Sequence, residues 1–276
     1  VTNGLAYFYV VTAVDAVGNE SVDSDEVWGL PEPPPPSYAE LVASDGAFAW
    51  WRLGDSAGTT AADAAGSHVA TYMGGVTLGA AGLLSGDGDH AAAFDGVNDY
   101  IAVKDAADIN TGGPYGSRSI ELWFRADDVS GRQVIYEEGG TTRGLAVYLD
   151  EGDLYVAGWN VKRDDATTPW GPVWVSTAVA AGTTYHLVLV FDHASDRLAG
   201  YLNGVSFGSA SGVGLLFKHS ANVGIGSVSQ ATRFHDGKSN LKTGHFFAGV
   251  IDEVALYGGA LSPKQITGHW TAGSGG

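Results

Sequence analysis

Apolar and polar positions alternate with the period of a β-strand from the start of this chain. Residues 7–14, YFYVVTAV, place aromatic and β-branched side chains alternately on two faces. The segment DAVGN that follows has turn chemistry, and residues 20–28 have the composition of a returning strand. The first 29 residues therefore predict a β-hairpin, which we call the N-terminal hairpin.

A proline run separates this hairpin from the rest of the chain. Residues 30–37, LPEPPPPS, favour polyproline II, which acts as a semi-rigid spacer between domains. Ser37 and Glu40 then have the spacing of a capping box. We therefore expect a domain boundary in this segment and a short helix that ends near Ala43.

Short runs with strand periodicity dominate the remaining sequence. They lie at 48–53, 91–103, 119–125, 133–137, 144–149, 154–159, 183–191, 198–202, 205–209 and 246–257. Asn203 and Gly204 are typical of a two-residue hairpin turn, and Ser262 with Pro263 predicts a final helix to about Trp270. Many short strands with almost no helix predict an all-β fold, a two-sheet antiparallel jelly-roll sandwich.

Specific motifs within residues 38–272 carry a family resemblance. In order they are AWWRLGDSAGTTAADAAG, AAAFDGVNDYIAV, SIELWFRADD, YHLVLVFD, LAGYLNGV and FFAGVIDEVALYGGALSPKQI. This ordered set resembles the laminin G-like, concanavalin A-like jelly roll. The resemblance implies a secreted or cell-surface domain, often appended to other domains, that binds glycans or proteins or serves as a spacer.

The N-terminal hairpin, residues 1–29, is similar to the last two strands of a fibronectin type III domain. Tyr7 matches that family's tyrosine-corner position, but the family's first five strands are absent. A lone hairpin is marginal in water and leaves its strand edges open. Three explanations remain: a fragment of a longer chain, packing on the next domain, or completion of a sheet in a neighbouring molecule.

Charge and composition exclude several classes of function. The chain has 31 acidic and 14 basic residues and a net charge of −17, so it would repel a nucleic acid. It has no cysteine, which excludes disulfides and thiolate metal sites. No apolar run reaches the ~20 residues that a membrane span needs. An acidic surface instead suits a divalent cation or a salty medium that screens the charges, or it serves solubility alone.

The carboxylates do not show the pattern of a glycoside hydrolase. Retaining enzymes need two carboxylates about 5–5.5 Å apart, and the glucanases of the resembled fold carry theirs as Glu-x-Asp-x-x-Glu on one strand. Here Glu121 is alone on its strand, while Asp252 and Glu253 are adjacent and should face opposite sides. We expect no enzyme activity, with hydrolysis as a distant alternative, and interpret His186 as a hydrogen-bonded structural residue.

Calcium is the cofactor that the resemblance implies. In the resembled fold a structural calcium often lies where the first and last strands meet. Asp252 in GVIDEV matches the last-strand carboxylate ligand, and backbone oxygens near Gly96 and Arg52 would complete its shell. Asp95 is a weaker candidate, because an Asp in this turn can instead bond the local backbone.

Aromatic residues in and beside a long polar loop are candidates for sugar binding. The loop in WNVKRDDATTPWGPVW contributes aromatic faces and hydrogen-bonding groups. These candidates are Trp159, Asn160, Arg163, Asp164, Trp170 and Trp174. The alternative is that the tryptophans pack the loop onto the sandwich, since Trp is usually buried.

A second loop, residues 230–244, concentrates basic residues. Arg233 and His235 lie in it with two lysines, which suits an acidic glycan or an acidic protein surface, although a solvated loop explains the charges equally well.

Together these features predict a non-catalytic extracellular adhesion module that binds a glycan or a protein, on the surface of a bacterium or in its matrix. The alternative is a structural subunit that self-associates through residues 1–29.

Overall fold

The alternating segments form β-strands in two separate units. The computed structural model describes residues 1–163 and 168–275, and the chain divides into the units Val1–Pro36 and Ser37–Gly276. Within the described residues, no helix is long and apolar enough to span a membrane.

The first unit contains the predicted N-terminal hairpin with a shorter ladder than expected. Strand β1 (Tyr7–Tyr9) pairs antiparallel with β2 (Val27–Gly29), and one further bridge joins Val14 to Glu20. Asp15 closes the turn, because its carboxylate accepts hydrogen bonds from the amides of Val17 and Asn19, both at 2.9 Å. Twelve of the eighteen exposed large hydrophobic side chains of the described residues belong to residues 1–30, so this unit has no core of its own.

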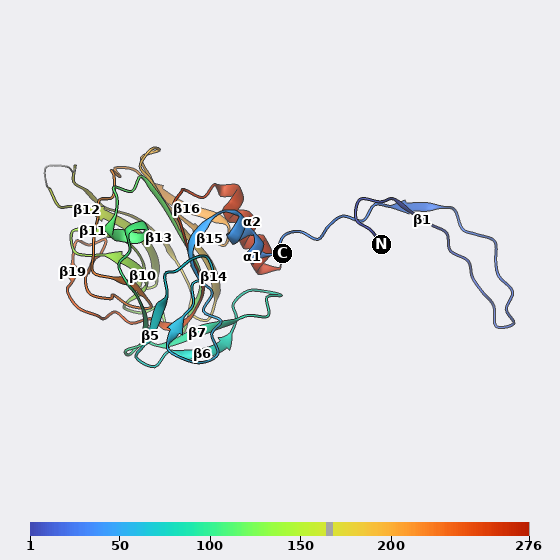
Figure 1. Cartoon of the computed structure of the whole chain (residues 1–276), viewed down its shortest axis with the longest axis horizontal. Helices are drawn as coiled ribbons and strands as arrows, with labels where there is room; N and C mark the ends of the chain where they lie inside the picture. Colours follow the sequence, from blue (N-terminus) through green and yellow to red (C-terminus); the bar gives the residue numbers. More distant parts are fainter. Residues whose placement is uncertain (164–167, 276) are drawn as a thin grey trace. The chain divides into compact units, whose positions relative to one another are not determined.

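Two eight-stranded sheets form the second unit, and every pairing in them is antiparallel (Figure 1). The first, the β11 sheet, has the order β13 (Trp170–Ala178), β12 (Asp153–Asn160), β11 (Arg143–Asp150), β10 (Arg132–Gly139), β17 (Val223–Ile225), β8 (Tyr100–Val103), β5 (Ala70–Met73) and β4 (Thr60–Ala61).

The second sheet, the β9 sheet, is built around the longest strands. Its order is β16 (Val205–Ala210), β15 (Arg197–Leu202), β14 (Thr184–Asp192), β9 (Ser117–Ala126), β20 (Ala248–Tyr257), β7 (His90–Asp95) and β6 (Thr77–Ala81), with β3 (Ala47–Trp51) also paired to β20. A single π-helical turn, η1, spans Ala107–Thr111. The predicted all-β antiparallel jelly-roll sandwich is confirmed.

The main core lies between the two sheets. Alternate residues of β9, such as Ile120, Leu122 and Phe124, point into it and meet Val147 and Leu149 of β11. All five side chains are fully buried. The intervening residues of β9 point the other way, so the outer face of this sheet also needs cover.

Two short helices cover the outer face of the β9 sheet. Helix α1 (Tyr38–Ser44) and helix α2 (Pro263–Ser274) lie side by side. Helix α1 begins with the predicted capping box, and α2 begins with the predicted N-cap Ser262, which also forms a capping box with Gln265. Trp270 of α2 stacks on Trp123 of β9 with 5.3 Å between the ring centroids. Gly273 makes this approach possible, because a Cβ there would lie 2.4 Å from the Trp123 ring.

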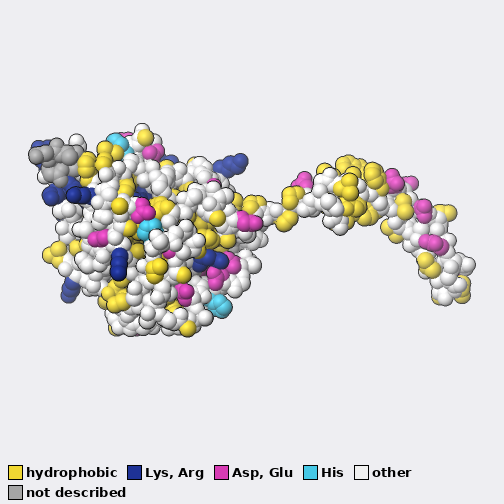
Figure 2. Space-filling view, in the orientation of Figure 1, with side chains coloured by type: hydrophobic (Ala, Val, Ile, Leu, Met, Phe, Trp, Pro, Cys, Tyr) yellow, Lys and Arg dark blue, Asp and Glu magenta, His cyan; other side chains and the backbone are white. Residues whose placement is uncertain are grey.

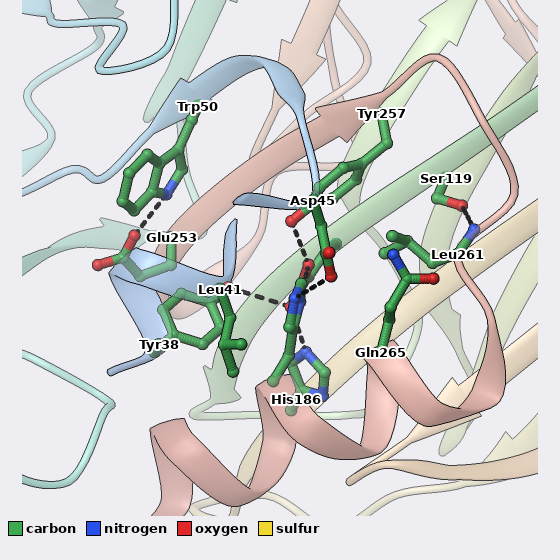
Figure 3. Close-up of polar contacts among 12 residues, drawn as sticks. Tyr38, Leu41, Asp45, Trp50, Ser119, His186, Glu253, Tyr257, Leu261 and Gln265 are labelled. Carbon is green, nitrogen blue, oxygen red and sulfur yellow. Dashed lines mark hydrogen bonds and ion pairs between the residues drawn. The ribbon is translucent and has the colours of Figure 1, made fainter. Parts of the chain in front are cut away.

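A buried carboxylate ties both helices to the sheet. Glu121 of β9 accepts hydrogen bonds from Tyr257 and from His186 Nε2, each at 2.7 Å, and from Tyr38 at 3.2 Å. His269 Nδ1 of α2 lies 2.9 Å from the same carboxylate. Figure 3 shows the side chains of Tyr38, His186 and Tyr257 converging on this point. We call this set of residues the Glu121 cluster; it confirms that His186 is hydrogen-bonded and structural.

The Glu121 cluster is held together by charge. His269 Nε2 lies 3.0 Å from Asp45, so both ring nitrogens face carboxylates and both bonds require an imidazolium. Burial opposes charge on His269, but its hydrogen bond to Glu121 and the charges of Glu121 and Asp45 outweigh burial and raise its pKa. Burial would likewise raise the pKa of Glu121, but the bonds from His186 and His269 hold it well below the ordinary value.

Replacing Glu121 with Gln should therefore destabilise the domain. We expect a loss of ~3 kcal/mol in the free energy of unfolding at pH 6, because a buried cation loses its partner. The contribution of His269 is present below its unfolded pKa of 6.5 and is lost as the pH rises through its higher folded pKa. Urea denaturation between pH 5 and pH 9 measures both effects.

The matched control is Glu151→Gln, which makes the same change at an exposed residue. It should alter the free energy of unfolding by less than ~0.5 kcal/mol. Equal stability of the two variants at pH 6 would contradict the role given to the Glu121 cluster.

Candidate functional site

The outer face of the β11 sheet is partly covered by a long loop. Residues 226–247, which we call the cover loop, contain the short strands β18 (Thr232–Arg233) and β19 (Ser239–Asn240). They lie on the side of the sandwich opposite to α1 and α2 (Figure 1). Phe234 of the cover loop packs with Tyr148 and Trp159 of the sheet in a separate apolar cluster.

Ion pairs fasten the cover loop to the sheet. Arg132 of β10 pairs with Asp150 of β11, Nε to carboxylate at 3.1 Å, and with Asp236 of the loop at 3.2 Å. Its guanidinium also lies 4.3 Å from the Phe234 ring centroid. On the other side of Phe234, Arg233 Nε donates to the Thr141 carbonyl at 2.7 Å. The loop is therefore held on both sides of Phe234 and His235.

Beside the cover loop the sheet presents aromatic side chains in a row. Tyr148 of β11 lies opposite Tyr155 of β12, and their rings stack at 5.2 Å. His235 of the loop stacks on Tyr155 at 4.1 Å. Trp174 of β13 lies 5.6 Å from Tyr155 and 5.3 Å from His235. We call Trp174, Tyr155 and His235 the aromatic ledge.

The ledge combines an open aromatic face with a fixed donor. Trp174 is 41% exposed, whereas Val173 and Val175 on either side of it pack toward the core, as strand alternation requires. The His235 amide donates to the Tyr148 hydroxyl at 2.8 Å, and that hydroxyl lies 3.0 Å from His235 Nδ1. Burial lowers the pKa of His235. Because the Tyr148 hydroxyl can donate its hydrogen to Nδ1, this arrangement suits a neutral ring with its proton on Nε2.

The structure places the other predicted sugar-binding residues away from this ledge. Trp159 is buried and donates to the Gly140 carbonyl at 2.9 Å, and Trp170 stacks on Phe191 at 5.7 Å inside the core. Asn160 is buried and accepts from the Phe217 amide at 3.4 Å. A ligand on the surface does not reach these three side chains, because Trp170 belongs to the core between the sheets, Asn160 is fully buried, and Phe234 of the cover loop packs over Trp159 on the outer face of the sheet.

Two further predicted positions also lie apart from the ledge. Arg163 is exposed beyond the end of β12, and Asp164 lies outside the described residues. Arg233 uses its guanidinium to hold the cover loop, with Nη1 donating to the Gly237 carbonyl at 2.9 Å. Of the predicted set, the structure thus brings together Trp174 and His235. It adds Tyr155, whose position on the outward face of an alternating strand was the signal available in the sequence.

The predicted calcium ligands lie in two places. Asp95 is opposite Ala248 in the β7–β20 ladder, and Asp252 lies further along β20, about 13 Å away at ~3.3 Å per residue. Asp95 accepts bonds from the amides of Val97 and Asn98, which hold the turn at Gly96. Asp95 and Gly96 are therefore separated from Asp252 by the register of the strands.

Around Asp252 the structure shows a buried acidic cluster crossed by one arginine. A β-bulge at Glu253, with φ of 53°, turns Glu253 and Asp252 toward the same narrow cleft, in contrast to the opposite faces predicted from alternation. Arg52 pairs with Glu253 at 2.9 Å, Asp87 at 2.7 Å and Asp89 at 3.1 Å. The Arg52 carbonyl accepts from the Glu253 amide at 3.4 Å.

Asp252 is the one carboxylate of this cleft with an unsatisfied buried oxygen. Its Oδ2 accepts from the Leu83 amide at 2.8 Å, but Oδ1 has no hydrogen-bond partner among the described residues. Burial, with the nearby charges of Glu253, Asp89 and Asp87, raises its pKa to about 8. Within the described residues, no three His, Asp or Glu side chains converge in a geometry that would hold a metal ion.

Comparisons with known proteins agree with this architecture. A family model described as the concanavalin A-like lectin/glucanases superfamily matches residues 95–267, more than half of the chain. No curated protein sequence matches the chain. The family match does not reach residues 1–29, so the likeness of the N-terminal hairpin to a fibronectin type III domain stays a prediction.

Solved structures with this fold include domains in complex with a ligand or a receptor. Domain 4 of AbnA, a GH43 extracellular arabinanase from Geobacillus stearothermophilus in complex with arabinotriose, has a TM-score of 0.51 and 19% identity over 81% of this chain and 97% of its own. The binding domain of botulinum neurotoxin DC in complex with SialylT has a TM-score of 0.57 and 12% identity, covering 83% of this chain and 51% of that one.

The same neurotoxin binding domain is also known in complex with rat synaptotagmin II. That structure has a TM-score of 0.58 and 13% identity, covering 83% of this chain and 52% of its own. This chain thus spans about half the length of the neurotoxin chains. At these identities the likeness concerns the fold alone.

Proposed function

The chain belongs to the concanavalin A-like lectin/glucanase superfamily, and from this premise we propose that it is a non-catalytic extracellular module that binds a glycan at the aromatic ledge. The observation that carries the proposal is the half-exposed indole of Trp174 beside the neutral imidazole of His235. Aromatic faces of this kind stack on sugar rings, and a fixed N–H donor orients a sugar hydroxyl.

The carboxylates near the ledge support binding over hydrolysis. Asp150 and Asp236 both pair with Arg132, so neither is poised to accept or donate a proton. Glu121 lies on the opposite sheet, fully buried beneath the helices. The arabinanase domain and the neurotoxin binding domain are structural precedents for ligand binding by this fold, with arabinotriose and SialylT respectively.

We further propose that calcium, where the protein meets it, binds at Asp252 and stabilises the fold. Asp252, whose Oδ1 has no hydrogen-bond partner among the described residues, lines the cleft together with Asp87, Asp89 and Glu253. Carboxylate oxygens are the donors that calcium prefers. Arg52 already balances part of the negative charge of this cleft. To bind Asp252, the ion would also have to displace the proton that burial favours on its carboxylate.

A second candidate function is self-association through the N-terminal hairpin, with a second copy of this chain as the partner. Phe8 is 63% exposed, Val11 71% and Trp28 68%. Figure 2 shows hydrophobic side chains along this unit. Pairing of open strand edges between molecules would cover these side chains. In this reading, residues 30–37 serve as the spacer between subunits.

Replacing Trp174 with Ala should weaken glycan binding by about tenfold or more, because stacking on the ledge is lost. A glycan array that includes arabinotriose, followed by calorimetry on the best ligand, measures the change. Trp28→Ala is the matched control, since it removes an exposed indole from the N-terminal hairpin. An array without signal, or equal binding by both variants, would refute the ledge as a glycan site.

Calcium should raise the melting temperature more at pH 8.5 than at pH 6. In chelator, stability should fall as the pH rises from the unfolded pKa of Asp252, 3.8, to its folded pKa of about 8, because the folded state holds the extra proton. Calcium would replace that proton. Asp252→Asn should abolish the rise in melting temperature that calcium causes, and Asp95→Asn should preserve this rise. If calcium at pH 8.5 leaves the melting temperature of the wild-type protein unchanged, the site is excluded.

If the hairpin mediates assembly, the chain should form oligomers whose size grows with concentration. Deleting residues 1–29 should leave a monomer in light scattering, and Phe8→Lys should weaken assembly without affecting the second unit. Lys104→Glu, an exposed change in the second unit, serves as the control. A concentration-independent monomer of the full chain would argue against assembly.

A further inference from the structure

The two ends of the cover loop meet at a narrow neck. The Val228 amide donates to the Gly244 carbonyl at 2.9 Å, and the Gly244 amide donates back at 3.3 Å. Next to this bridge, the Thr243 hydroxyl donates to the Ser229 carbonyl at 2.6 Å. These bonds join the two ends of the loop to each other, so the loop is attached to the sheet here as one unit. We call residues 227–229 and 243–244 the neck.

The neck is seated on a carboxyl group of β10. Glu137 lies between Ala146 of β11 and Gly224 of β17 in the sheet, and its Oε1 accepts from the Ser229 amide at 2.8 Å. Gly224 makes this close approach possible, because a Cβ there would lie 2.2 Å from the Ser227 carbonyl oxygen. Glu137 is fully buried as a result. Its carboxyl group is enclosed between the sheet and the neck.

No cation balances this carboxyl group. Among the described residues, no Lys, Arg or His side chain forms an ion pair with Glu137, and its Oε2 has no hydrogen-bond partner. Arg233 of the cover loop donates to backbone carbonyls instead. Burial raises the pKa of Glu137 well above its ordinary value, against the effect of the Ser229 bond. The charges of Glu138, its neighbour on β10, and of Asp105, which follows β8, add to this rise.

An uncharged acid fits this position, and a carboxylate does not. Taking an unpaired ion out of water costs far more free energy than taking out a neutral hydroxyl group. The neutral acid needs no counter-ion, and its Oε1 still accepts the bond from Ser229. A carboxylate at Glu137 would need water, and the neck excludes water as long as it stays closed.

We propose that Glu137 is a positioning residue of the aromatic ledge, which in its uncharged form holds the neck, and through it the loop that carries His235, on the sheet. Glu137 touches no ligand and acts through the neck. When it loses its proton, the neck opens to hydrate the carboxylate, and the loop keeps its attachments at Arg132 and Arg233 alone. The effect on a ligand rests on the proposed glycan binding, whereas the opening of the neck does not.

This mechanism gives the pH dependence a definite sign. With the neck closed, the pKa of Glu137 lies above the ordinary value of 4.5 that applies once the side chain reaches water. Between these two values the open state binds fewer protons than the closed state, so the closed neck loses stability as the pH rises. The equilibrium constant for opening should increase about tenfold for each pH unit until the higher pKa is reached.

The test is amide hydrogen exchange of the full chain without ligand, between pH 5 and pH 9, with intrinsic exchange rates divided out. In the wild-type protein, protection of the Val228 and Ser229 amides should fall about tenfold per pH unit over the window in which Glu137 titrates. Glu137→Gln keeps the shape and the acceptor oxygen but cannot ionise, so it should remove this pH dependence. Glu151→Gln, the same change at an exposed residue, should retain the wild-type slope.

Glycan binding gives an independent readout. Between pH 6 and pH 9 the affinity of the wild-type protein should fall as the neck opens, and Glu137→Gln should remove this fall. Trp174→Ala should weaken glycan binding without changing exchange in the neck, so a failure of the ledge as a glycan site is seen separately. Neck protection that does not depend on pH in the wild-type protein, or that falls equally in Glu137→Gln, would overturn the proposal.

Discussion

One buried carboxylate determines which surface of this domain is open. Glu121 lies on the outer face of the β9 sheet, and its hydrogen bonds to Tyr257, His186 and His269 replace the water that the charge would otherwise need. Because His269 belongs to α2 and Tyr38 to α1, satisfying this charge also fastens both helices over the sheet. The outer face of the β9 sheet is therefore closed, and the recognition surfaces belong to the other sheet.

On the β11 sheet, cover is incomplete, and this creates the aromatic ledge. The cover loop packs Phe234 onto the sheet and is held by Arg132, but it leaves the indole of Trp174 on β13 41% exposed. His235 of the loop lies beside this indole, with 5.3 Å between the ring centroids. An open aromatic face of this kind suits a sugar, because sugar rings offer apolar faces for stacking.

Local patterns predicted the fold well, and long-range placement limited the prediction of the sites. The strand period, the capping box of α1 and the N-cap of α2 depend on neighbours in sequence, so they could be predicted. Trp159 and Trp170 were expected to meet ligand because their loop is polar, but Trp170 points into the core between the sheets and the cover loop buries Trp159 on the outer face. The ledge needs His235 from a loop about 80 residues beyond Tyr155, and the bulge that brings Glu253 beside Asp252 breaks strict alternation. Neither contact leaves a local signature.

Hydrogen–deuterium exchange with and without the best oligosaccharide from a glycan array tests most directly which face is used. The account predicts that bound ligand slows exchange in β12, β13 and the cover loop and leaves α1 and α2 unchanged. Slowed exchange centred on the two helices, with no change along β12 and β13, would show that the closed face is the binding face and would contradict the account.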